Sequence, residues 1–552
     1  MPEGSRPFLP RSPDNGAVCL RRIAVLLLSL LIVASAQAQL TLNRYIGSGN
    51  TITWDPAEGG FLLSTVNWTN NGFTNISSVS VTIDLSPVIP DEFWVGGTAA
   101  ILAYNEFEPN EEIADVYTYD PGDFSDSLNA TFSLTNSFTS PLVDNEWSLS
   151  IDNLPDPDQV GAGVLNYWRL IVTGDAVTNG TISVGQQGII SASSSYTVNG
   201  ATISVVGAGT NGVTVTNNSG LTFNGGLTGS GDLNKVGSGV LSVGGNSTGF
   251  TGTFRLNEGT ANFTATNALG SGTLIQSNGS STAIFSAGGT YNDNMSLYNV
   301  SFTNGGNTLS GTITNNGSGT FLSAASTTNT ISGVITGSGG LTKDGTGALV
   351  IAGSANNTFT GATVVDEGRL VLSNSSGNAI HSSSSITVNS GGTLVLGASN
   401  QIGDGIGLIL SGGTFLVGAA NVTEDLGTLT LTADSTIDFG NFGATGLRQL
   451  TFDNSAGISW NGTLTITNWQ GVANTSSEFT DIFFGVGGLT TAQQGQIRFA
   501  NQGNVAGTLL GTGELVPVPE PKIYVAALAL LGVVGWRERR RIAAIIGLKR
   551  SS

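Results

Sequence analysis

The chain has very little cysteine, histidine and positive charge for its 552 residues. Cys19 is the single cysteine, so the sequence offers no disulfide bond and no cysteine-based metal site. His381 is the single histidine and lies in a serine-rich segment, without the Gly-x-Ser-x-Gly elbow that accompanies many catalytic triads. We interpret it as a solvated loop residue. The formal net charge of −19 argues against nucleic acids and anionic lipids as partners, because both would be repelled.

Proline and tryptophan are each missing from one long central stretch. No proline occurs in residues 158–516, and no tryptophan occurs in residues 169–459. Proline removes a ladder hydrogen bond, so its absence is compatible with a long, uninterrupted stack of strands. These breaks divide the chain into a unit rich in Trp and Pro at 39–175 and a unit rich in Gly, Ser, Thr and Asn at 176–445.

The second unit contains internal repeats. Leu227–Phe263 and Ile335–Leu372 align over their whole length with one inserted residue, and a shorter pair lies at Asn389–Gly397 and Leu410–Gly418. Short alternating runs between Gly-rich turns are typical of strands, and their tandem repetition predicts a parallel β-helix. A disordered Gly/Ser linker is the alternative. The hydrophobic content of 39% and the regular alternation argue against it.

The repeat pattern has a recognisable form. G-S-G-x-L-x-K-x-G-x-G-x-L followed by F-T-G and E-G resembles the autotransporter-associated β-strand repeat of bacterial surface proteins. The resemblance covers much of residues 200–420. It implies an exported β-helix and does not indicate a particular chemistry.

The first unit resembles a different domain near its end. Glu146–Asp152 and Gly163–Val172 are similar to the last strands of the P domain, a β-sandwich that follows some subtilisin-like proteases. The resemblance implies a jelly-roll-like sandwich over 39–175, here without the protease. Acidic residues gather between Glu106 and Asp126, where loop carboxylates could hold Ca²⁺. No EF-hand spacing is present, and we favour a solvated acidic surface with no cofactor.

The N-terminus has the composition of an export signal. Arg21 and Arg22 precede the apolar run Ile23–Val33, and small residues follow it. This order predicts a signal peptide with an extended leader over residues 1–38, which signal peptidase would cut at the site formed by Ala36 and Ala38.

The C-terminus ends in an apolar run and an arginine cluster. Ile523–Trp536 would form a helix roughly 21 Å long, a marginal transmembrane span for a hydrocarbon core of about 30 Å. A positive cluster after the run predicts the cytoplasmic side. Its members are Arg537, Arg539, Arg540 and Arg541.

The order of these features resembles the PEP-CTERM sorting signal that exosortases process in Gram-negative bacteria. The resemblance makes residues 516–552 the sorting signal and assigns the motif to Pro519, Glu520 and Pro521. Residues 446–515 look like the segment that often precedes such signals, and we expect them to form strands that cap the solenoid. A plain, permanent C-terminal anchor is the alternative.

The sequence therefore predicts an all-β protein: an N-terminal sandwich, a parallel β-helix and a short C-terminal transmembrane helix. We expect a structural or adhesive protein of the cell surface or extracellular matrix, with surface polysaccharide as a partner and only transient contact with the inner membrane. A carbohydrate-binding protein and a β-helix enzyme acting on polysaccharide are the alternatives. An enzyme would need its charged groups from a short list, Lys235, Lys343, Asp232 and Asp344, and the shared repeat position of the lysines indicates a structural role.

Overall fold

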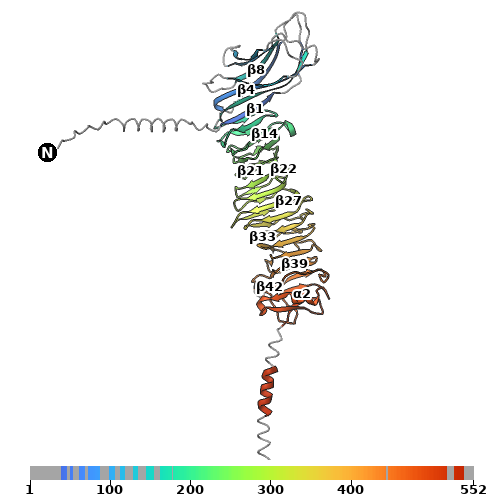
Figure 1. The fold of residues 1–552 in the computed structure, drawn as a ribbon. Coiled ribbons are helices and arrows are strands. Elements are labelled where there is room, and N and C mark those ends of the chain that lie inside the picture. Colours follow the sequence, from blue (N-terminus) through green and yellow to red (C-terminus); the bar gives the residue numbers. More distant parts are fainter. Residues whose placement is uncertain are drawn as a thin grey trace, which may run out of the picture.

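The computed structural model describes a long rod of stacked strands (Figure 1). The described residues are 39–46, 50–53, 61–68, 73–87, 98–105, 112–118, 128–134, 145–153, 162–176, 178–442, 446–518 and 528–539. Residues 1–38, which include Ala36 and Ala38, lie outside this set, as do Pro519, Glu520, Pro521, Arg540 and Arg541.

Residues 178–442 and 446–518 wind into a solenoid in which, up to β44, strands pair with those of the next coil in parallel. For example, Leu233 of one strand aligns with Val213 of the coil before it and with Phe254 of the coil after it. The predicted parallel β-helix is thereby confirmed. Its first strands are β10 (Thr181–Ser183), β11 (Ile189–Ala192), β12 (Tyr196–Val198), β13 (Thr202–Ser204), β14 (Val213–Thr216), β15 (Leu221–Phe223), β16 (Leu227–Gly229), β17 (Leu233–Val236), β18 (Val240–Val243), β19 (Gly249–Phe250), β20 (Thr253–Leu256), β21 (Thr260–Phe263), β22 (Thr273–Gln276) and β23 (Thr282–Phe285).

The second half of the solenoid contains a twelve-stranded sheet that runs along one face from β24 to β46. The strands of this half are β24 (Thr290–Tyr291), β25 (Met295–Phe302), β26 (Thr308–Leu309), β27 (Ile313–Ser323), β28 (Thr328–Ile331), β29 (Ile335–Thr336), β30 (Leu341–Asp344), β31 (Ala348–Ile351), β32 (Thr363–Val365), β33 (Gly368–Leu372), β34 (Ile386–Asn389), β35 (Gly392–Leu396), β36 (Leu408–Ser411), β37 (Thr414–Val417), β38 (Val422–Leu426), β39 (Leu429–Ala433), β40 (Ser435–Asp438), β41 (Arg448–Phe452), β42 (Leu464–Thr467), β43 (Thr480–Phe483), β44 (Ile497–Phe499), β45 (Val505–Leu509) and β46 (Leu515–Pro517).

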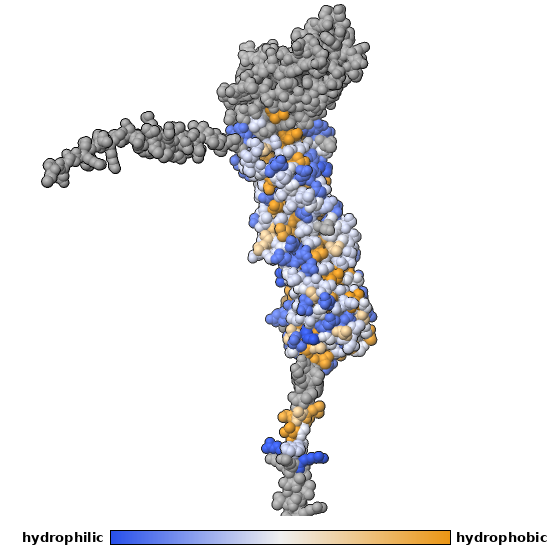
Figure 2. Space-filling view, viewed as in Figure 1, coloured by the Kyte–Doolittle hydropathy of each residue, from blue (hydrophilic) through white to orange (hydrophobic). Residues whose placement is uncertain are grey.

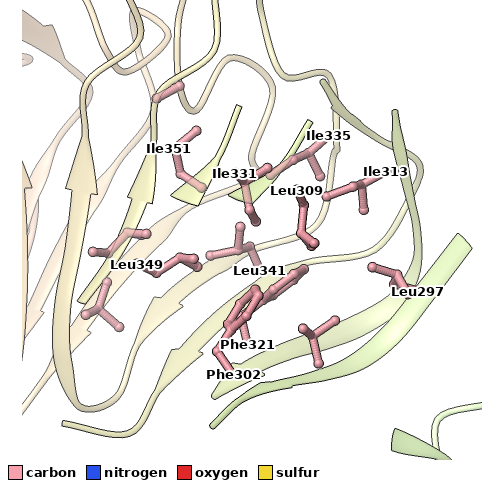
Figure 3. Close-up of a cluster of buried hydrophobic side chains, with 14 of the residues drawn as sticks. Leu297, Phe302, Leu309, Ile313, Phe321, Ile331, Ile335, Leu341, Leu349 and Ile351 are labelled. Carbon is pink, nitrogen blue, oxygen red and sulfur yellow. The ribbon is translucent and has the colours of Figure 1, made fainter. Parts of the chain in front are cut away.

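Alternation along each strand builds the core. In β31 the pattern is half-buried, buried, half-buried, buried, so Leu349 and Ile351 point inward. Figure 3 shows them with other inward side chains, among them Leu341 of the same coil and Phe321 and Phe302 of the two preceding coils. Each buried aliphatic or aromatic side chain contributes roughly 1.5–3 kcal/mol through removal of apolar surface from water. The core is continuous because every coil adds its own set.

Glycine makes the corners between coils possible. At Gly333 the φ angle is ordinary, yet a Cβ atom would lie 1.8 Å from the carbonyl oxygen of Gly311 in the coil before it. Gly252 has the same relation to Gly231, also at 1.8 Å. The glycines of the repeat therefore allow two backbones to approach at distances that any side chain would block.

Antiparallel strands cover both ends of the stack. At the N-terminal end, β1 (Leu40–Ile46) pairs antiparallel with β11 of the first coil and with β9 (Ala162–Ala176). At the other end, β44, β45 and β46 pair antiparallel in succession. An open ladder edge is a site for pairing with other chains, so these strands oppose end-to-end aggregation.

The first unit consists of antiparallel strands. β4 pairs with both β7 and β9, while β3, β8, β5 and β6 form a separate four-stranded sheet. A sandwich of these sheets remains a prediction. The further strands are β2 (Asn50–Thr53), β3 (Phe61–Trp68), β4 (Phe73–Pro87), β5 (Thr98–Asn105), β6 (Glu112–Thr118), β7 (Leu128–Leu134) and β8 (Asn145–Asn153).

Helical structure is scarce in the described part of the chain. Two 3₁₀ turns lie at Gly209–Asn211 and Ala500–Gln502, and a helix occupies residues 528–539. The five-residue helix α2 (Thr491–Gly495) begins with a capping box, in which the side-chain oxygens of Thr490 and Gln493 each accept a hydrogen bond from the other's backbone amide. The sequence analysis missed α2. Its signal was the Thr-x-x-Gln spacing rather than helical periodicity.

Candidate functional site

A buried lysine binds the backbone at one corner of the repeat, the turn between β30 and β31. Lys343 stands at an inward position of β30, in register with Phe321 before it and Val365 after it, and is 0% exposed. Its Nζ atom donates to the carbonyl oxygens of Asp344 (2.8 Å), Gly345 (2.6 Å) and Glu367 (3.1 Å). Three acceptors match the three donors of an ammonium group. Lys343 therefore fastens the corner of its own coil to the corner of the next.

The other repeat copy has the same corner. Lys235 is 0% exposed, and its Nζ atom donates to the carbonyl oxygens of Val236 (2.9 Å), Gly237 (2.6 Å) and Glu258 (3.2 Å). Burial lowers the pKa of Lys235 to about 8, and it lowers the pKa of Lys343 likewise to about 8. These contacts agree with the structural role that the repeat position predicted.

The candidate acids also make structural contacts. Asp232 is buried, accepts a hydrogen bond from the Gly209 amide at 2.6 Å and forms an ion pair with Arg255 at 3.1 Å. Burial acts to raise the pKa of Asp232, but these partners outweigh it and the pKa is lowered. Asp344 accepts from the amide of Gly345 at 2.7 Å. These contacts hold both acids against backbone amides of their own or the preceding coil.

The remaining expectations concern histidine and metal. His381 is exposed in a turn, in agreement with the solvated-loop interpretation. Within the part of the chain that the structure describes, no group of three or more His, Cys, Asp or Glu could hold a metal ion. Most of the acidic loop segment between Glu106 and Asp126 lies outside the described residues, so Ca²⁺ there stays untested.

A buried carboxyl group was missed by the sequence analysis. Glu424 is 1% exposed in β38, where the sequence Val-Thr-Glu-Asp-Leu puts it in phase with the inward Val422 and Leu426. Its carboxylate accepts from the backbone amides of Gln401 and Ile402, both at 2.8 Å. Burial raises the pKa of Glu424 to about 7. The alternation of β38 was the signal that could have located it.

The buried carboxyl groups make stability depend on pH. Burial also raises the pKa of Asp293 and of Asp481, each to about 6. Because the folded state holds these protons more tightly than the unfolded state, their stabilisation is complete below the unfolded pKa values and is lost as pH rises through 6 to 7. We expect the midpoint of thermal unfolding to increase on acidification from pH 7.5 to 5. Glu424→Gln should flatten this dependence; the exposed Glu478→Gln should leave it unchanged.

A steady unfolding midpoint over that range would contradict the assignment. So would an equal pH dependence in Glu424→Gln and in the parent protein, measured by circular dichroism in matched ionic strength.

The C-terminal helix presents apolar and basic side chains. Residues 528–539 form a helix in which Leu528, Leu530 and Leu531 are 67–68% exposed, and Arg537 and Arg539 lie exposed near its end (Figure 2). None of the helices in the described ranges is long and apolar enough to cross a membrane. The predicted span at 523–536 begins outside the described residues and stays a prediction.

The outer faces of the solenoid consist mainly of hydroxyl, amide and aliphatic side chains. Outward positions in register across coils form columns such as Thr222, Ser242 and Asn262. Figure 2 shows polar and apolar residues mixed over the visible face of the rod. Such a surface offers many hydrogen-bonding groups in a fixed, periodic arrangement.

Comparison with known proteins agrees with this architecture. The family model described as "passenger-associated-transport-repeat" matches residues 341–372, a segment that contains Lys343 with its partners Asp344, Gly345 and Glu367. Repeats of this kind are typical of exported passenger domains on cell surfaces. No curated protein and no solved structure matches the chain significantly.

Proposed function

We propose that this protein is an exported structural or adhesive component of a Gram-negative cell surface or extracellular matrix, with the solenoid as its stalk. The observation that supports this most is the capped β-helix with a transport-associated repeat at 341–372. A continuous core, no need for disulfides and an acidic, hydroxyl-rich exterior suit a protein that must stay folded and soluble outside the cell.

Export and sorting complete the proposal. Signal peptidase removes residues 1–38 at Ala36 and Ala38, and the tail then holds the chain at the inner membrane with Arg537, Arg539, Arg540 and Arg541 on the cytoplasmic side. An exosortase-type enzyme recognises Pro519, Glu520 and Pro521 and releases the protein. Surface polysaccharide or matrix is the final partner, and no catalytic activity is part of the proposal. The corner contacts of Lys235 and Lys343 support a non-enzymatic role.

The sorting motif gives a direct prediction. Alanine in place of Pro519, Glu520 and Pro521 together should abolish release, so that the protein accumulates in the membrane fraction of its native host at the uncut mass. Lys522→Gln, one residue beyond the motif, is the matched control and should be released normally. Fractionation followed by immunoblotting distinguishes the forms. Normal release of the triple variant would rule out the motif as a sorting signal.

A further inference from the structure

The positive charges of the solenoid are distributed unevenly between core and surface. Three of its cationic side chains, Lys235, Lys343 and Arg448, are 0% exposed, and Arg255 forms an ion pair with Asp232. The remaining two are Arg369 and Arg498. Neither forms an ion pair with a carboxylate of the described residues. These arginines are thus the positive groups that the solenoid can offer to a ligand.

The two arginines lie on one column of one face. Arg369 of β33 and Arg498 of β44 belong to the twelve-stranded sheet, and the residues between them along the column are all threonine. The register is continuous through Arg369, Thr393, Thr414, Thr436, Thr465 and Arg498. Five strand spacings separate the ends, a distance of about 24 Å. Each member alternates with buried core residues and therefore points outward.

A second column gives the same face an aliphatic stripe. Two residues along each strand, Val371, Val395 and Leu416 stack in register beside the threonines. Val371 and Leu416 are half-buried, Val395 between them is 4% exposed, and Asp438 is the next member of the column. Threonine and valine have restricted χ1 angles, so ordering them against a ligand costs little side-chain entropy. The face thus combines threonine hydroxyl groups with the partly exposed aliphatic side chains of Val371 and Leu416, which suit the polar and apolar surfaces of a sugar chain.

The acidic residues around this face do not neutralise the arginines. Asp438 accepts from the Gly440 amide (2.9 Å) and the Asn468 side chain (2.6 Å), while Asp434 accepts from the Thr463 amide (2.7 Å). Glu367 precedes Arg369 by two residues without an ion pair between them. Among the residues that the structure describes, Arg498 donates only to the backbone carbonyls of Gly495 and Ile497, both at 2.7 Å.

We propose that the Arg369–Arg498 column, with its aliphatic stripe, binds an extended acidic polysaccharide that runs along the solenoid axis. Guanidinium groups recognise carboxylate and sulfate in bidentate geometry. The ligand must have widely spaced negative charges, because the protein around the face is acidic and repels a dense polyanion. Backbone pairing with an added peptide strand does not apply, since the face presents side chains rather than a ladder edge. This inference rests on the proposed adhesive function and names its ligand class.

Affinity electrophoresis of the full-length purified chain tests the proposal. Gels contain highly methyl-esterified polygalacturonate, sparsely sulfated dextran or neutral dextran, so that widely spaced carboxylate and sulfate ligands are distinguished from an uncharged chain. We expect retardation by at least one of the acidic polymers, weakened by salt, and none by dextran. Arg369→Gln with Arg498→Gln should raise the dissociation constant about tenfold. Thr414→Glu, in the middle of the column, should do the same.

Thr387→Glu is the matched control. Thr387 is an outward, half-buried threonine of β34 on a different ladder, in register with Val364 and Ile409. Its variant should bind like the parent protein. Three results would overturn the proposal: no binding of either acidic polymer, full affinity in the double arginine variant, or an equal loss of affinity in Thr387→Glu and Thr414→Glu. The two proposals can fail separately. If the purified protein binds an acidic polymer but the native host does not carry it at the cell surface, the proposed location is wrong and the binding face is still supported.

Discussion

Replacing Gly333 by alanine is expected to destabilise the solenoid by about 3 kcal/mol or more. The added Cβ atom would lie 1.8 Å from the carbonyl oxygen of Gly311, and the obstacle is backbone that no side-chain rotation can remove. The coils must therefore separate at this corner, which breaks neighbouring ladder hydrogen bonds. Overpacking of this kind costs several kilocalories per mole when nothing flexible can yield.

The control for this prediction is Gly457→Ala. A Cβ atom at Gly457 would meet nothing within 4 Å, and Gly457 also lies in a turn with ordinary φ. Its unfolding free energy should change by less than about 0.5 kcal/mol. Urea unfolding followed by far-UV circular dichroism compares the variants. Equal stability of Gly333→Ala and Gly457→Ala would mean that the corner is not as tightly stacked as described.

Replacing Lys343 by methionine is expected to cost about 3 kcal/mol, although the side-chain volume is nearly kept. The substitution leaves the carbonyl oxygens of Asp344, Gly345 and Glu367 without the Nζ donor, in a corner where Lys343 is 0% exposed and water has little access. One effect of the substitution is stabilising, because methionine carries no charge and so avoids the desolvation penalty of the buried lysine ammonium. The unpaired carbonyls dominate the balance, at about 1–3 kcal/mol each.

In Lys343→Met, unfolding should begin in the coils next to the substitution before the whole solenoid unfolds. A solenoid gains stability from contacts between adjacent coils, so a broken corner opens first at its own coil and the next. In Lys343→Met, amide hydrogen exchange should accelerate over residues 335–372 and stay unchanged in the distant copy around Lys235. Thr342→Val, an outward change in the same strand, should leave exchange as in the parent. Protection of 335–372 in Lys343→Met at parent levels would show that the lysine only fills space.

The sequence was sufficient for features that depend on local alternation. Leu233 and Lys235 share one phase of a strand, as do Val422, Glu424 and Leu426, so the inward direction of each charged member follows from its hydrophobic neighbours. The coil-to-coil repeat then placed the two lysines in equivalent corners. Local pattern and repetition are enough to predict a parallel β-helix.

Features that depend on pairing across many residues could not be predicted. Arg369 and Arg498 are far apart in the sequence, and they share a column only because coil lengths between them bring β33, β35, β37, β40, β42 and β44 into register. The pairing of β1 with β11 likewise joins the first unit to the solenoid through contacts that no local pattern indicates. Turn lengths vary from coil to coil, and a shift of one residue would reverse every outward side chain.

The proposed function requires that the protein is exported and cut at both ends. The most direct test is the mass of the mature protein recovered from the cell surface or matrix of its native host, measured by intact mass spectrometry with sequencing of the terminal peptides. We expect a chain that begins at Gln39 and ends near Pro519–Pro521. A chain that still ends at Ser552 and stays in the membrane fraction would contradict it, and the tail would then be a permanent anchor.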